Sequence, residues 1–210
     1  MVEPIQKMQL PEQTLSNSSF DPFADLMVMQ AAKPQHWRPI DLRTLTPFQR
    51  ALVSIDGTVT KFIESYMLEP VEIVRLQQQE QVLRTDHPWL AAPVGTTVIA
   101  RQALLSGKYS ATIYAYAVSL LLAERLPTEV LRGLDVEPAG LGHIILNSQL
   151  ENRREVLWYG HEQVADLPEA IEVYTGNEFI SRTYRIIVGN QPVMLINEKF
   201  PTVCPIEKVR

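Results

Sequence analysis

Near its C-terminus the chain carries a β-hairpin pattern that dictates where the side chains of two strands point. Residues Phe179 to Val188 and Pro192 to Phe200 are rich in apolar and β-branched residues, and Gly189-Asn190 between them suits a two-residue turn. Successive side chains of a strand point to opposite faces, so residues two apart share a face. The hairpin therefore predicts an antiparallel sheet in which inner and outer residues can be told apart.

Other stretches with a period of two extend this prediction to about six strands. They cover four ranges: Val71 to Leu83, Thr96 to Leu105, Ala111 to Leu121 and Arg153 to Glu162. The second and third of these ranges flank Ser106-Gly107-Lys108, which indicates another hairpin. Runs of antiparallel strands with helices gathered at one end are typical of an α+β domain.

Two short helices are predicted ahead of the strands. Thr46-Pro47-Phe48-Gln49 combines a threonine N-cap, a proline at the first helical position and a glutamine three residues past the cap. After a break at Asp56-Gly57, apolar residues recur at helical spacing and form one stripe: Val59, Phe62, Ile63, Tyr66 and Met67. Pro70 ends this second helix. The pattern predicts a helical hairpin that leads into the sheet.

The rest of the chain completes a single domain. A short helix is predicted from Leu126 through about Gly133, and Glu137 to Gly142 has the composition of a loop. No repeat and no Gly/Ser linker divides the sequence. We therefore predict one α+β domain over residues 37–210, with an antiparallel sheet of about six strands and helices on one side. Residues 1–36, rich in Gln, Ser, Asn and Pro, are expected to form an N-terminal extension, partly ordered or wrapping the domain.

Composition and charge argue against several classes of protein. Of the 210 residues 46% are apolar and 20% charged, which is typical of a globular chain with its own core. Cys204 is the single cysteine, and no secretory leader pattern opens the sequence. The longest apolar run, Ala111 to Ala123, falls well short of the roughly 20 residues of a membrane-spanning helix. The net charge of −5 disfavours nucleic acid as a partner. We expect a cytoplasmic monomer that binds neither nucleic acid nor membranes.

Two charged residues stand where strand alternation predicts core side chains. Arg101 shares its strand face with three apolar residues: Ile99, Ala103 and Leu105. Glu198 likewise shares its strand face with three apolar residues: Met194, Ile196 and Phe200. Burying an unpaired charge costs several kcal/mol, so each residue needs a partner or a ligand. Arginine offers a planar fork to a carboxylate and glutamate accepts a hydrogen bond from a hydroxyl, so a cavity holding both suits a small hydroxylated acid.

These two residues also have a purely structural interpretation. Arg101 and Glu198 would then form a salt bridge with each other, or a sheet edge or bulge would turn one of them to water.

Other chemistries are weakly supported. His161-Glu162 begins like a zinc-binding helix motif, but Ala165 stands where the second histidine belongs. Cys204 has no nearby histidine, no serine stands in a nucleophile-elbow context, and no glycine loop suits a phosphate. We therefore expect neither a metal nor an organic cofactor.

Four segments stand in an order that also occurs in a known family of enzymes. They are Asp56–Lys61, Ala100–Leu105, Pro138–Gly142 and Gly189–Pro201. On these segments the chain resembles the chorismate-pyruvate lyase family over roughly residues 42–203. The resemblance implies an antiparallel sheet with a helical flap over a buried ligand cavity. It also implies the conversion of chorismate to 4-hydroxybenzoate and pyruvate without metal or organic cofactor, which would feed quinone-type biosynthesis.

The resemblance further implies roles for single residues. Arg101 matches the arginine that holds the ring carboxylate, and Glu198 matches the glutamate that meets the ring hydroxyl. Leu141 matches a leucine of the loop that lines the cavity, and Val59 matches a flap residue whose backbone faces the ligand. The glutamate could be protonated and act as an acid toward the leaving group, or ionised and orient the ring hydroxyl.

The register at the end of the chain allows two choices for the acidic position. Asn197 precedes Glu198 where the family would have threonine, and one extra residue after Gln191 leaves either Asn197 or Glu198 facing the cavity. We take Glu198, because it falls on the apolar face and because one branch of the family has this longer spacing. Lys199 then marks the face of Asn197 as the expected solvent side.

A second class of function is compatible with the same pattern. The fold resembles the effector-binding domain of a family of transcription regulators, which bind small acids or sugars without turning them over. Such regulators carry a winged-helix domain first, whereas only about 40 residues precede the first predicted helix here, without a helix-turn-helix pattern. A non-catalytic module that binds an aromatic acid is therefore the alternative interpretation.

Overall fold

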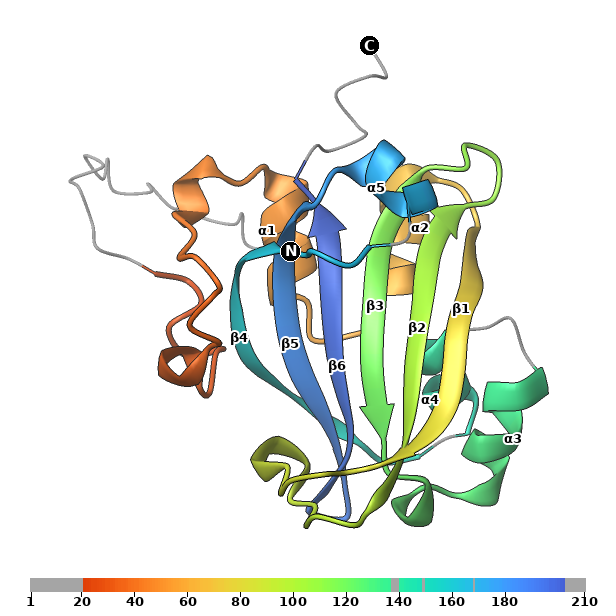
Figure 1. Cartoon of the computed structure of the whole chain (residues 1–210). Coiled ribbons are helices and arrows are strands. Elements are labelled where there is room, and N and C mark those ends of the chain that lie inside the picture. Colours follow the sequence, from red (N-terminus) through yellow and green to blue (C-terminus); the bar gives the residue numbers. More distant parts are fainter. Residues whose placement is uncertain (1–20, 137–139, 149, 168, 203–210) are drawn as a thin grey trace, which may run out of the picture.

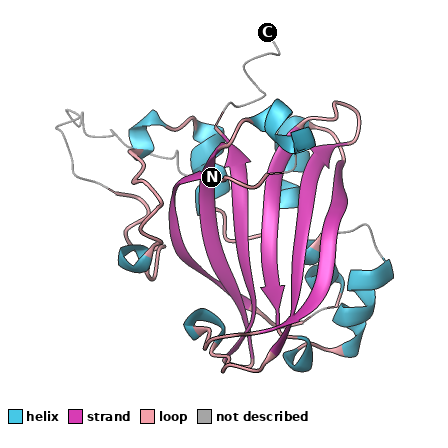
Figure 2. Ribbon diagram, in the orientation of Figure 1, coloured by secondary structure: helices cyan, strands magenta, loops and turns pink. Residues whose placement is uncertain are grey.

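A single sheet dominates the computed structural model, which describes residues 21–136, 140–148, 150–167 and 169–202 (Figure 1). Its strand order is β1-β2-β3-β6-β5-β4, and every neighbouring pair is antiparallel. The strands form one twisted layer with helices at its ends and on its faces (Figure 2). The predicted α+β class with about six strands is confirmed.

The strands lie close to the predicted ranges. Their bounds are β1 Val71–Val82, β2 Thr97–Gly107, β3 Ile113–Leu121, β4 Arg153–Gln163, β5 Glu178–Val188 and β6 Gln191–Pro201. The β5–β6 turn at Gly189 and Asn190 uses positive φ angles of 53° and 67°, which glycine and asparagine tolerate best. The β2–β3 connection differs from the prediction, since β2 runs through Gly107 and β3 begins only at Ile113.

The predicted helical hairpin is present as α1 (Pro47–Ser54) and α2 (Val59–Met67). The Thr46 side chain accepts a hydrogen bond from the Gln49 backbone N–H at 3.2 Å, and the Gln49 side chain accepts one from the Thr46 N–H at 2.9 Å. This reciprocal capping box satisfies two backbone donors at the helix start. It therefore sets the point where α1 begins.

Three more helices follow, and the sequence predicted only the first. They are α3 (Thr128–Val136), α4 (Leu141–Asn147) and α5 (Glu169–Thr175). Helix α4 begins inside the stretch that was predicted as loop, because Ile144 and Ile145 bury their side chains in the main core despite the flanking glycines. Short 3₁₀ helices cover Gln30–Ala32, Leu42–Thr44, Pro88–Leu90 and Ala123–Arg125.

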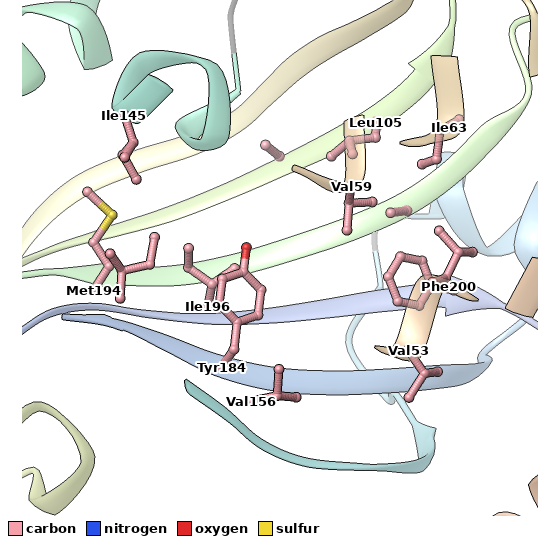
Figure 3. Packing of buried hydrophobic residues seen from close by; sticks show 14 of the residues in the cluster. Val53, Val59, Ile63, Leu105, Ile145, Val156, Tyr184, Met194, Ile196 and Phe200 are labelled. Atoms are coloured by element: carbon pink, nitrogen blue, oxygen red, sulfur yellow. The ribbon is translucent and has the colours of Figure 1, made fainter. Parts of the chain in front are cut away.

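The two faces of the sheet have separate apolar clusters. The larger cluster joins one face to α1, α2, α3 and α4, and Figure 3 shows Val59, Ile63 and Ile145 on the same side of the sheet as Tyr184 and Ile196. A smaller cluster on the opposite face packs α5 onto β3 and β5: Tyr116, Leu167, Ile171 and Phe179. The prediction of helices on one side is therefore incomplete, since α5 covers part of the other side.

The segment before α1 packs along the edge of the sheet. The backbone N–H groups of Val28 and Met29 donate to the carbonyls of Val156 and Leu157 in β4, at 3.0 Å each. The side chains of Phe23 and Met27 are buried in the main core. Residues 1–20 of the expected N-terminal extension, Pro138 and Ala139 of the expected loop, and Cys204 lie outside the described residues.

Candidate functional site

All four residues that the resemblance singled out line one cavity. Arg101 and Glu198 stand on the sheet face that carries the larger core, and Val59 and Leu141 begin α2 and α4 above it. Most of the remaining wall is apolar or small, with Ile73, Leu105 and Ile196 among its members. The structure thus brings together residues that lie up to 139 positions apart in the sequence.

Strand register places the polar residues of this cavity in adjacent rows across the sheet. One row runs through cross-strand partners: Arg101, Ser119, Ile196 and Tyr184. The next row also runs from strand to strand: Ala103, Ala117, Glu198 and Arg182. Side chains in such rows project from the same face, so one ligand can meet both rows at once.

Arg101 is a buried cation without a partner among the residues that the structure describes. Its residue is 3% exposed, and its Nε and Nη1 atoms are buried with no hydrogen-bond partner among the described residues. Burial, and then the nearby charge of Arg75, lowers the pKa of the Arg101 guanidinium. A guanidinium in this position is stabilised by an anion that enters the cavity.

Glu198 is buried as well, but it has two protein partners. Its Oε2 accepts a hydrogen bond from Arg182 Nε at 2.9 Å, and its Oε1 accepts one from the Tyr184 hydroxyl at 3.2 Å. Burial, and then the charge of Glu198, raises the pKa of Tyr184, so this hydroxyl remains a donor. The structural alternative of an Arg101–Glu198 salt bridge is therefore wrong, because the carboxylate pairs with Arg182 instead.

Arg182 ties the carboxylate to the helical hairpin. Its Nη1 donates to the carbonyl of Ile55 at 2.7 Å and to that of Val53 at 3.3 Å, at the end of α1. The guanidinium also lies over the Tyr184 ring, 5.0 Å from its centroid. Because α1 is held to the sheet in this way, the residues that cover the cavity are Gly57 to Thr60 rather than the whole hairpin.

Two chain segments meet above the cavity and close it. A Cβ atom on Gly142 would lie 2.9 Å from the Thr58 methyl group, so only glycine allows this approach. The space among the lining residues is ≈ 560 Å³ including its open mouth. Gly57–Thr60 and Gly140–Gly142 are therefore the segments that cover the cavity.

Asn197 and Lys199 lie on the opposite face of the sheet. The Asn197 side chain donates to the Arg182 carbonyl and to Thr183 Oγ1, both at 3.2 Å. Lys199 is 6% exposed and pairs with Glu162 at 2.8 Å, so the prediction that it marks a solvent side is wrong. Glu198 lines the cavity, whereas Asn197 is no part of its described wall.

Comparison with known proteins decides the family. The model of the Rv2949c-like chorismate pyruvate-lyases matches residues 53–209. The chain belongs to this family. A chorismate pyruvate-lyase of Mycobacterium leprae (strain TN) is 28% identical over 166 residues, covering 76% of this chain and 77% of the relative. That of Mycobacterium tuberculosis (strain ATCC 25618 / H37Rv) is 26% identical over 169 residues, covering 76% and 82%.

Solved structures with this fold include an effector domain. The effector domain of PhnF from Mycobacterium smegmatis superimposes with a TM-score of 0.53 at 11% identity, covering 79% of this chain and 92% of that domain. The structure of PhnF itself gives a TM-score of 0.54 at 12% identity, covering 81% and 69%. At such identities the likeness concerns the fold alone.

Among the residues of this lyase-family cavity and its immediate support that were not predicted as site residues, Arg182, Arg154 and Tyr184 bear most on its charge. Arg182 was detectable, because it shares its strand face with Ile180 and Tyr184. Arg101 shares a face with apolar residues of its own strand in the same way. Arg154 lines the cavity from β4 on the same face as Val156, and the bulge at Leu157 lies beyond both residues, so its position was detectable as well. The contact of Tyr184 with Glu198 depends on the pairing of β5 with β6.

Neither a metal cluster nor a membrane span occurs in the part of the chain that the structure describes. No group of three or more His, Cys, Asp or Glu side chains is placed to hold a metal ion there. In the same residues, no helix combines the length and the apolar character that crossing a membrane requires.

Proposed function

We propose that this protein is a chorismate lyase, which converts chorismate to 4-hydroxybenzoate and pyruvate without a metal or organic cofactor. The observation that carries the proposal is that one largely apolar cavity is lined by both Arg101, which has no partner among the described residues, and Glu198, which Arg182 holds. Membership of the chorismate pyruvate-lyase family supports the same reaction. That the product feeds quinone-type biosynthesis stays a prediction.

The reaction makes modest chemical demands on the protein. The bond between ring carbon 3 and the ether oxygen breaks, a proton leaves ring carbon 4, and the released enolpyruvate takes up a proton to become pyruvate. Substrate and products balance with no net oxidation or reduction, and the product ring is aromatic. The protein therefore needs to fix the ring, hold its carboxylate and exclude water.

Arg101 is suited to hold the ring carboxylate. Two of its nitrogens are buried without a partner among the described residues, and the planar guanidinium offers parallel N–H pairs that fix the orientation of a carboxylate as well as neutralise its charge. Val59 and Leu141 close the space above the ring from the two covering segments. A planar ring held at one edge and covered from above has few orientations left.

Glu198 is suited to orient the ring hydroxyl as an ionised carboxylate. A carboxylate has about four acceptor sites, and Arg182 and Tyr184 occupy one each. Two sites therefore remain for a hydroxyl in the cavity. Of the two roles that the sequence left open, the salt bridge with Arg182 supports the orienting role over that of a protonated acid.

Incubation of the purified protein with chorismate tests the proposal directly. We expect pyruvate, followed by coupled lactate dehydrogenase, and 4-hydroxybenzoate, followed by chromatography, to appear in equal amounts. A chelator should have no effect on the rate. Heat-inactivated protein is the control, because chorismate also decomposes slowly on its own.

Two results would contradict the proposal. Equal pyruvate with the 3-hydroxy isomer would indicate a different elimination. Tight binding of 4-hydroxybenzoate without any pyruvate would support the non-catalytic binding module.

A further inference from the structure

The cavity contains more positive charge than its carboxylate neutralises. Its described wall includes two cations, Arg101 and Arg154, and one anion, Glu198. Arg182 lies behind the wall and already forms the ion pair with Glu198. The two lining arginines are therefore left without a counter-charge among the described residues.

Arg154 resembles Arg101 in having a buried nitrogen without a partner in the described part of the chain. Its Nε is buried with no hydrogen-bond partner in the described part of the chain, although the residue as a whole is only half-buried. Its neighbour Arg153 contrasts with it, because Arg153 is exposed and forms an ion pair with Glu155. Two adjacent arginines of one strand thus have opposite environments, and only Arg154 lines the cavity.

The two free arginines reach the cavity from opposite sides. Arg101 stands on β2 and Arg154 on β4, with β3, β6 and β5 between them, which separates their backbones by about 19 Å at usual strand spacing. In register, Arg154 is level with Met194, whereas Arg101 is level with Ile196. Along β6, Glu198 lies one row beyond Ile196, on the side away from Met194. The three charged groups therefore form a triangle rather than a line.

We propose that Arg154 is a second anion-binding residue, which takes the carboxylate of the enolpyruvyl side chain while Arg101 takes the ring carboxylate. This inference rests on the proposed function and adds the basis of substrate selection. Chorismate has two carboxylates and a ring hydroxyl that do not lie on one line, matching the triangle of Arg101, Arg154 and Glu198. The site then prefers a dicarboxylate over a monocarboxylate.

A direct role of Arg154 in binding the side-chain carboxylate affects substrate and product differently, whereas a general contribution to cavity shape would affect both. The product 4-hydroxybenzoate keeps the ring carboxylate and the hydroxyl but lacks the side-chain carboxylate. Arg154 therefore contributes to the binding of substrate and not to that of product. Arg101 contributes to both.

Kinetics of Arg154→Gln measure this difference. We expect KM for chorismate to rise about 10- to 100-fold, the effect of one lost charge-assisted interaction, while Ki for 4-hydroxybenzoate changes less than about twofold. Arg154→Lys should fall between the variant and the wild type, because it keeps the charge but loses the fork. Arg153→Gln, on the exposed neighbour, is the matched control and should change neither constant.

Calorimetry supplies a readout that does not depend on turnover. The probe is 4-hydroxyisophthalate, which carries carboxylates on ring carbons 1 and 3 beside the hydroxyl on carbon 4. Wild-type protein should bind it more tightly than 4-hydroxybenzoate, and Arg154→Gln should cancel that preference.

The outcomes distinguish the inference from the proposed function. An absence of pyruvate with wild-type protein would contradict the proposed function alone, while a dicarboxylate preference lost in Arg154→Gln would still support the second anion site. Parallel rises in KM and Ki in Arg154→Gln would overturn the inference, since Arg154 would then act on a part that substrate and product share. Unchanged constants, or equal binding of the two probes by wild-type protein, would overturn it as well.

Discussion

The two faces of the sheet each bury charged side chains, but they neutralise them differently. On the face away from the cavity, Lys199 pairs with Glu162 and contacts Asn197, so its charge has partners within the protein. On the cavity face, Glu198 is paired while Arg101 is not. Lys199, Glu198 and Arg101 are thus similarly buried, but only the first two have a charged partner among the described residues.

This difference separates structural charges from binding charges. A buried ion pair that is complete within the protein has no need of a ligand, whereas a buried cation without an anion favours one. Burial alone would have assigned Lys199 and Arg101 to the same class, since they are 6% and 3% exposed. The distribution of partners, rather than the extent of burial, marks the cavity face as the binding side.

The largest effect is expected from Glu198→Gln. Losing the negative charge that meets the ring hydroxyl should lower kcat about 100- to 1000-fold, as for other preorganised groups in enclosed sites. Some stability is also lost, because Arg182 then faces a neutral amide, so kcat is measured well below the thermal midpoint. Asn197→Ala, on the opposite face, is the control and should stay within about twofold of wild type. A normal kcat in Glu198→Gln beside an inactive Asn197→Ala would reverse the assignment of the faces.

Replacing Arg101 should separate binding from stability. Arg101→Met should raise KM for chorismate and Ki for 4-hydroxybenzoate by about 10- to 100-fold each, and Arg101→Lys should do less. Because Met removes a buried unpaired charge, the thermal midpoint should stay equal or rise. Thermal unfolding followed by circular dichroism, together with steady-state kinetics, checks both. A clear loss of stability with unchanged KM would make Arg101 a structural residue.

On the opposite face, Glu162→Gln should show the reverse behaviour. Lys199 would remain buried without its counter-charge, which should lower the free energy of unfolding by about 2 kcal/mol. Both kcat and KM should stay within about twofold of wild type, since this face does not line the cavity. Urea unfolding measures the stability change. A rise in KM of more than about twofold, measured where the variant is still fully folded, would show that the two faces are coupled.

The smallest effect is expected at the covering segments. Gly142→Ala would bring a methyl group to 2.9 Å from the Thr58 methyl, which should hold the segments apart and weaken inhibition by 4-hydroxybenzoate about fivefold. Adding Thr58→Ser removes the opposing methyl and should restore most of the inhibition. If the single variant is inhibited like wild type, these segments do not control release of the product.

Much of the fold could be predicted because strands and helix ends depend on local chemistry. The capping box at Thr46, the turn at Gly189-Asn190 and the alternation around Arg101 and Glu198 each involve residues close in sequence. Helix α4 could not be predicted in this way. Its first two residues belong to a stretch whose proline and glycine composition is typical of a loop, and its helical conformation depends on burial of Ile144 and Ile145 against distant elements.

The sequence by itself determined which side chains share a face, because the period of a strand is a property of the backbone. It therefore placed Arg101 and Glu198 on inner faces. Only the tertiary structure decided which charge each of them meets. The pairing of β5 with β6 brings Arg182 to Glu198, and the pairing of β4 with β5 places Arg154 opposite Ile186 on the cavity face. Electrostatic partnership depends on distances between separate strands, and local sequence pattern contains no information about those distances.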